Sequence, residues 1–233
     1  MLNLYPSLFV ALSGSAAVAF LLQMVVLRHG ELCAGQRARV QGQFTTITSC
    51  ATLGALCAFE AGQAFWQTGL LIVAAVMGWG MSWKLSKLRI KQSLDQNWWW
   101  LLGAPLCLNA LAVVVANPFL LFAFALSGAS LGHWLLVKAK HRLSAFDKIL
   151  PFAGILFGML SMSSAALALW LGADRAAMAE YQQGFMIFAV LLLSSVLLWL
   201  LPMFRDIKPA ASALVVVMLG TLASTVQLQN LLS

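Results

Sequence analysis

The chain alternates between long apolar runs and short polar connections. Eight apolar runs can be marked, and they cover residues 8–27, 43–59, 67–83, 98–116, 118–137, 149–171, 184–203 and 209–228. A helix crosses a bilayer with about 20 apolar residues, and the lower limit is about 17. The second and third runs are close to this limit, and the others are longer. The pattern therefore predicts an all-α integral membrane protein with eight transmembrane helices.

The basic residues follow the same alternation. All but one of the 14 Lys and Arg residues fall in the first, third, fifth or seventh connection, and the exception is Arg175. Cytoplasmic connections of membrane proteins are enriched in basic residues, so these four connections are expected in the cytoplasm and both termini outside. The formal net charge of +7 is thus explained by topology, and no nucleic-acid partner is expected.

Composition supports a membrane protein and bears on domain organisation. The chain is 62% hydrophobic and 9% charged, with a mean hydropathy of +0.90, so residues 1–233 are expected to form a single transmembrane domain in contact with lipid. The string Ala11-Leu-Ser-Gly14 recurs as Ala125-Leu-Ser-Gly128, four spans later. This echo suggests two parallel four-helix units, 1–116 and 117–233, whose Ser and Gly residues would allow close helix approach.

The residues that could carry redox or catalytic chemistry are few. The four cysteines form no CxxC pair, which argues against an iron–sulfur or zinc site in this chain. Only His133 among the three histidines lies inside an apolar run, whereas a membrane b-type haem needs two buried His ligands. An interhelical hydrogen bond is the stronger interpretation of His133. No GxSxG, HExxH or glycine-rich phosphate motif is present, so we expect a non-catalytic chain without metal or haem.

A stand-alone transporter of a small molecule or ion is the alternative class. Gln23, Asn109 and the hydroxyl residues of the run 43–59 could supply polar groups within the membrane. No charged residue lies at the centre of an apolar run, although ion-coupled transport usually requires one.

Three consecutive tryptophans, Trp98, Trp99 and Trp100, open the fourth apolar run beside a basic connection. Tryptophans at this depth are typical of an interfacial aromatic belt. Stacking of a quinone ring on these indoles is the other interpretation.

Glu60 is the carboxylate most closely enclosed by apolar segments. It follows Phe59 and precedes a short turn on the expected outer side, with Gln63, Trp66 and Gln67 close in sequence. A carboxylate there could accept a proton released by quinol oxidation. Alternatively, it faces water at the end of a helix.

Several strings resemble the dimethyl sulfoxide reductase anchor subunit family. Residues 185–202 (FMIFAVLLLSSVLLWLLP), followed by Lys208-Pro-Ala-Ala, are similar to the end of its seventh span and the start of its eighth. Residues 122–136 (FAFALSGASLGHWLL) look like its fifth span, and 69–80 (GLLIVAAVMGWG) like its third. The resemblance extends over nearly the whole chain.

The resemblance implies a non-catalytic subunit of an anaerobic respiratory complex in the bacterial inner membrane. Such an anchor binds menaquinol and passes electrons to an iron–sulfur subunit, which supplies a molybdopterin-containing catalytic subunit. Family members carry a His-Leu-Gly string after the second span, where this chain has Glu60-Ala-Gly62. The comparison makes Glu60 the candidate replacement for a quinol-linked histidine, with Gln63, Trp66 and Gln67 beside it and His133 as a further residue of a quinol pocket.

Overall fold

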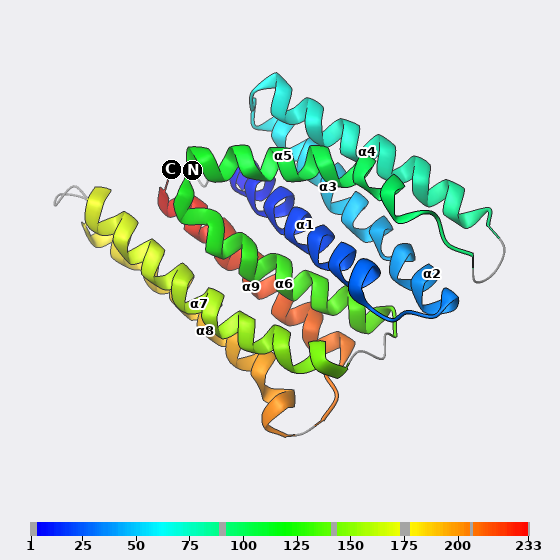
Figure 1. Ribbon diagram of the computed structural model, residues 1–233. Coiled ribbons are helices and arrows are strands. Elements are labelled where there is room, and N and C mark those ends of the chain that lie inside the picture. The colour runs from blue at the N-terminus through cyan, green and yellow to red at the C-terminus, as the bar shows by residue number, and fades with distance from the viewer. Residues whose placement is uncertain (1–3, 89–91, 141–143, 173–177, 206, 233) are drawn as a thin grey trace.

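The computed structural model describes residues 4–88, 92–140, 144–172, 178–205 and 207–232. All regular secondary structure within these ranges is helical (Figure 1). In chain order the elements are α1 (Leu4–His29), α2 (Ala34–Gly42), α3 (Phe44–Glu60), α4 (Phe65–Ser86), η1 (Gln96–Trp99), α5 (Trp100–Ala116), η2 (Pro118–Leu120), α6 (Leu121–Lys138), α7 (Ser144–Gly172), α8 (Met178–Phe204) and α9 (Ala211–Leu232).

Each predicted apolar run coincides with one long helix. Within the described ranges, seven helical segments are long and apolar enough to cross a membrane, and the remaining long helix, α3, has only 17 residues. The structure therefore supports a multi-pass membrane protein, and the crossing by α3 stays a prediction. Helix α2 was not predicted, because its nine residues are mostly polar and small.

The long helices pack as two groups of four. Helices α1, α3, α4 and α5 contact one another in a ring, as do α6, α7, α8 and α9. Helices α1 and α6 join the groups, and α1 also contacts α9. The single transmembrane domain 1–233 and its division into repeated units, 1–116 and 117–233, stay predictions.

The two ends of the bundle differ in charge. Helix α1 begins and α9 ends at the same end, which we call the terminal end (Figure 1). The opposite end, which we call the basic end, carries Arg28, Arg37, Arg39, Lys84, Lys87, Lys138, Lys140, Lys148, Arg205 and Lys208. The alternation of basic residues along the chain thus becomes a separation in space.

Small residues allow α1 and α6 to approach closely. A Cβ atom added at Gly14 would overlap the ring of Phe124, and one at Gly128 would meet the carbonyl oxygen of Ser15. The hydroxyls of Ser15 and Ser127 lie 2.6 Å apart and form a hydrogen bond between the two helices. Both copies of the echoed string therefore lie in one interface, where glycine and serine replace bulky side chains as expected for membrane helices.

Two polar side chains hold the connection between α4 and α5 against the basic end. The amide of Gln41 donates to the carbonyl of Leu94 and accepts from its N–H, both at 2.8 Å. Gln96 donates to the carbonyl of Leu27 at 3.0 Å. These bonds give partly buried backbone groups at the end of the bundle their partners.

The three consecutive tryptophans do not all belong to an interfacial belt. Trp98 and Trp100 are exposed, whereas Trp99 is fully buried and stacks on Phe44 with ring centroids 4.4 Å apart. The belt interpretation is therefore wrong for Trp99. The reason is that η1 turns the middle ring toward α3 while its neighbours face outward.

Candidate functional site

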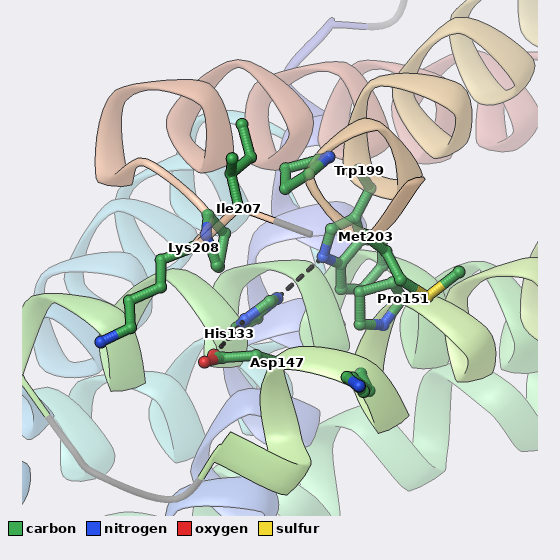
Figure 2. Close-up of a pocket in the computed structure, with 10 residues that line it drawn as sticks. His133, Asp147, Pro151, Trp199, Met203, Ile207 and Lys208 are labelled. Carbon is green, nitrogen blue, oxygen red and sulfur yellow. Dashed lines mark hydrogen bonds and ion pairs between the residues drawn. The ribbon is translucent and has the colours of Figure 1, made fainter. Parts of the chain in front are cut away.

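A buried histidine near the basic end of α6 links three helices. His133 is fully buried, and its Nδ1 accepts a hydrogen bond from Trp199 Nε1 of α8 at 2.8 Å. Its Nε2 lies 3.4 Å from Oδ1 of Asp147 at the start of α7 (Figure 2). His133 thus links α6 to both α7 and α8, and each ring nitrogen makes one of these interhelical contacts.

The bond from Trp199 selects one form of the histidine. An indole N–H only donates, so Nδ1 of His133 must present a lone pair. In the neutral ring the proton then lies on Nε2 and points to the Asp147 carboxylate, an assignment that follows from the hydrogen-bond pattern. Both nitrogens are therefore engaged, and His133 presents no free nitrogen to a metal ion.

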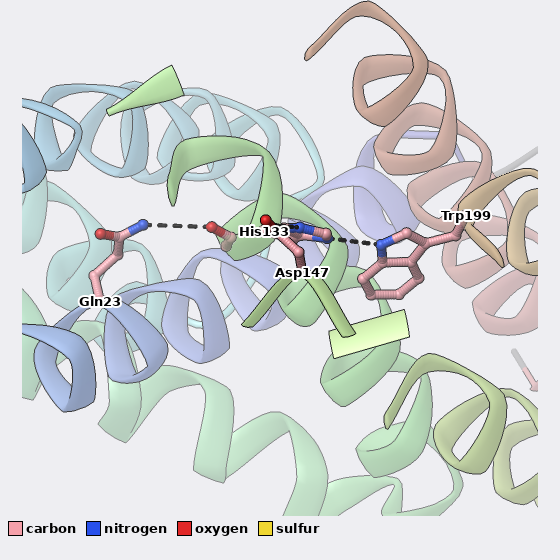
Figure 3. Close-up of polar contacts among 5 residues, drawn as sticks. Gln23, His133, Asp147 and Trp199 are labelled. Carbon is pink, nitrogen blue, oxygen red and sulfur yellow. Dashed lines mark hydrogen bonds and ion pairs between the residues drawn. The ribbon is translucent and has the colours of Figure 1, made fainter. Parts of the chain in front are cut away.

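Local sequence features position the three side chains. Asp147 lies in the first turn of α7, where the partial positive charge of a helix N-terminus favours a carboxylate. The indole ring of Trp199, on α8, packs against Gly154 of α7, where an added Cβ atom would overlap the ring. Gln23 of α1 donates to the carbonyl of Gly132, the residue before His133, at 3.5 Å (Figure 3). The histidine is thus held from α1, α7 and α8.

A pocket of about 280 Å³ opens beside this network. His133, Asp147 and Trp199 form its polar side. The other lining residues are apolar or basic, namely Pro151, Pro202, Met203, Ile207, Pro209, Lys148 and Lys208 (Figure 2). Asp147 remains partly exposed, with 29% of its side chain accessible, so a carboxylate and a buried histidine border a space with apolar walls.

Glu60 lies in a different environment, in the last turn of α3. The helix ends in a Schellman motif, in which Gly62 has a φ of 62° and its N–H donates to the carbonyl of Phe59. The N–H of Gln63 donates to the carbonyl of Ala58 at 3.0 Å. Glu60 is exposed there, and among the described residues its side chain forms no hydrogen bond or ion pair.

The candidate residues from the sequence do not form one site. Trp66 is exposed, and Gln63 and Gln67 are partly buried, all near Glu60 at the terminal end. His133 lies near the basic end, so the structure separates it from the other four residues. A role of Glu60 in quinol oxidation stays a prediction.

Sequence reasoning missed Asp147. The available signal was an acidic residue at the start of an apolar run, in a connection that is otherwise basic. Its pairing with His133 depends on how α6 and α7 cross, which the sequence does not specify.

Other polar groups within the membrane are less well partnered. Both amide atoms of Asn109 are buried and have no hydrogen-bond partner among the described residues, as is true of Oε1 of Gln23. Among the residues that the structure describes, no group of three or more His, Cys, Asp or Glu residues is arranged to hold a metal ion.

Comparison with curated proteins and with solved structures finds no match. A family model described as an integral membrane domain matches residues 5–231, which is nearly the whole chain. The protein therefore belongs to this integral membrane domain family.

Proposed function

We propose that the chain is the membrane anchor subunit of a respiratory oxidoreductase, and that it binds a quinol in the pocket beside His133. The observation that carries this proposal is the His133–Asp147 pair at the edge of an apolar space of about 280 Å³. A quinol needs an apolar slot for its ring and polar groups for its two hydroxyls. The resemblance of several spans to the dimethyl sulfoxide reductase anchor subunits supports the same substrate class, menaquinol.

The residues of the pocket have distinct roles in this proposal. Quinol oxidation releases two protons and two electrons. The Asp147 carboxylate accepts a proton from a quinol hydroxyl as the O–H bond breaks. His133 is a positioning residue, because its Nε2–H orients the carboxylate and its Nδ1 is held by Trp199. The second proton leaves through the open side of the pocket.

The electrons go to a partner, because the chain is proposed to hold no redox centre of its own. An iron–sulfur subunit accepts them one at a time and passes them to a molybdopterin catalytic subunit. Since the pocket opens near the basic end, we place the iron–sulfur subunit there. The distance from the quinol to the iron–sulfur subunit would then be short, and electron transfer would require no rearrangement of the bundle.

The same proposal includes a topology. All eight long helices cross the inner membrane of a bacterium, with both termini outside and the basic end in the cytoplasm. Support comes from the position of α1 and α9, which start and finish at one end, and from the basic residues at the other. Helix α3, with 17 residues, reaches the lower limit for a span of about 17 residues.

Two conservative substitutions test the site. Asp147→Asn and Glu60→Gln each remove a carboxylate with little change in shape, and each is made in the intact membrane complex. Asp147→Asn is expected to slow quinol-driven acceptor reduction by about 100-fold or more, as for loss of a general base. If the pocket beside His133 is the quinol site, as proposed, Glu60→Gln leaves the rate unchanged, whereas the role predicted for Glu60 from the sequence requires a loss.

Two results would contradict this assignment. An unchanged rate in Asp147→Asn with normal assembly would remove the pocket from the mechanism. A large loss in Glu60→Gln would move quinol oxidation to the terminal end, where the turn after α3 lies.

The transporter alternative is separated by affinity purification of the full chain. Co-purification of iron–sulfur and molybdenum subunits supports the anchor. A chain that purifies alone and binds no quinol analogue would contradict it.

A further inference from the structure

A second pocket adjoins the first at the basic end. It measures about 300 Å³ and is lined by Val137, Lys140, Asp147, Lys208 and Pro209. Asp147, Lys208 and Pro209 also line the pocket beside His133. The second pocket therefore lies nearer the end of the bundle, between the end of α6 and the segment that leads into α9.

Among the described residues that line the two pockets, basic side chains outnumber acidic ones. Lys140 and Lys208 line the second pocket and Lys148 the first, whereas Asp147 is the one carboxylate among the described lining residues. Asp147 is bonded to His133. None of the three lysines forms an ion pair within the described ranges.

Other lysines at the same end are differently arranged. The ammonium groups of Lys84, Lys87 and Lys138 lie over the rings of Trp98, Trp83 and Trp134, at 5.0, 3.6 and 4.9 Å from the ring centroids. Cation–π contacts of this kind hold an ammonium group at an aromatic face. The lysines of the pockets lack such a contact among the described residues. They line instead the recess that the two adjoining pockets form together, Lys148 in the first pocket, Lys140 in the second and Lys208 in both.

The backbone of Lys140 is strained. Its φ of 52° lies in the left-handed region, just past the end of α6, where a helix commonly ends with glycine. A lysine in that position costs free energy that a glycine would not. Non-glycine residues in strained backbone conformations cluster at active and ligand-binding sites, and the Lys140 side chain borders a pocket.

The surroundings favour a lipid over a free anion. Phe204 and Ile207 are 75% and 55% exposed beside the segment that carries Lys208. Exposed apolar side chains next to ammonium groups at the end of a helical bundle match the boundary between lipid headgroups and acyl chains.

We propose that the recess lined by Lys140, Lys208 and Lys148 binds the phosphate group of an anionic phospholipid, whose acyl chains lie along α8. Basic pockets between transmembrane helices bind such headgroups. The proposal does not depend on quinol binding, because the lysines and not the His133–Asp147 pair carry it.

The test uses the purified full-length chain in a neutral detergent. Binding of short-chain phosphatidylglycerol is measured by titration, with phosphatidylcholine and inorganic phosphate as separate probes at constant ionic strength. Each lysine near an anionic headgroup contributes about fivefold to affinity, so Lys140→Gln with Lys208→Gln should weaken phosphatidylglycerol binding about 30-fold. Phosphatidylcholine binding should not change.

Lys138→Gln is the matched control, because it removes a charge at the same depth from a lysine that lies over Trp134. It should alter affinity less than twofold. Circular dichroism and elution volume verify that the variants fold. Equal losses in the control and the double variant would show a general charge effect and overturn the proposal. Inorganic phosphate that binds with the same lysine dependence and affinity as the lipid would overturn the assignment to a lipid.

Discussion

The hydrogen bond between Trp199 and His133 makes a quantitative prediction about the bundle. Trp199→Phe keeps an aromatic ring against α7 and removes the Nε1–H that His133 accepts. His133→Leu removes the acceptor at similar volume. The two single variants and the double variant form a thermodynamic cycle that isolates the interaction from lost packing.

The geometry of this bond indicates a coupling energy in the upper part of the range for interhelical hydrogen bonds. The donor and acceptor are 2.8 Å apart, and the two side chains are 1% and 0% exposed, so the bond is shielded from bulk water. Interhelical hydrogen bonds in membranes contribute about 0.6 kcal/mol on average and about 1.7 kcal/mol at most. We expect a coupling of about 1.5 kcal/mol, which is roughly a 13-fold change in the unfolding equilibrium constant.

The assay is reversible unfolding in mixed micelles by sodium dodecyl sulfate, followed by far-ultraviolet circular dichroism. The control cycle pairs His133→Leu with Trp170→Phe, because Trp170 is 79% exposed on the outer surface of α7. The control coupling should be near zero. A Trp199–His133 coupling below about 0.4 kcal/mol, within the scatter of independent sites, would refute the reasoning.

Three further predictions concern packing and topology. Gly128→Ala should destabilise the bundle by about 1–3 kcal/mol, because the new methyl group meets α1. Gly80→Ala, with open space around its Cβ, should be neutral or slightly stabilising in the same unfolding assay. Equal effects of the two substitutions would contradict the close approach of α1 and α6. The exposed Cys33, near the basic end, should react with a membrane-impermeant maleimide in inverted vesicles and not in intact cells, and the reverse result would invert the proposed topology. Gln41→Leu should remove the partners of both partly buried backbone groups of Leu94 and accelerate limited proteolysis between α4 and α5, whereas an unchanged rate would show that other contacts hold this segment.

The positions of the long helices could be predicted from the sequence because a bilayer fixes their length and composition. The turn at Asn117-Pro118 is an example: α5 ends at Ala116 and η2 begins at Pro118. Helix α2 could not be predicted in this way because it contains no apolar run. The polar first turns of α7 and α8 were omitted for the same reason, so both helices begin earlier than the runs 149–171 and 184–203 indicate.

The arrangement of the candidate site could not be predicted in the same way. His133 is 14 residues from Asp147 and 66 from Trp199, and each partner lies on a different helix. Hydropathy identifies helices that cross a membrane but does not specify which faces meet, because tilt and rotation depend on neighbouring helices. Glu60 was conspicuous in the sequence for its apolar flanks, whereas its exposure depends on how α3 ends.

The central position of α1 has a consequence for biosynthesis. This helix leaves the ribosome before α6, yet its Ser15 is hydrogen-bonded to Ser127 of α6, which follows 112 residues later. At about 5–20 residues per second, synthesis of the intervening chain takes about 6–22 s. During that time the α6-facing side of α1, with its serine hydroxyls, has only lipid, early helices or the insertion machinery as neighbours. Assembly of the second group of helices therefore completes the surroundings of a helix that was made before all of them.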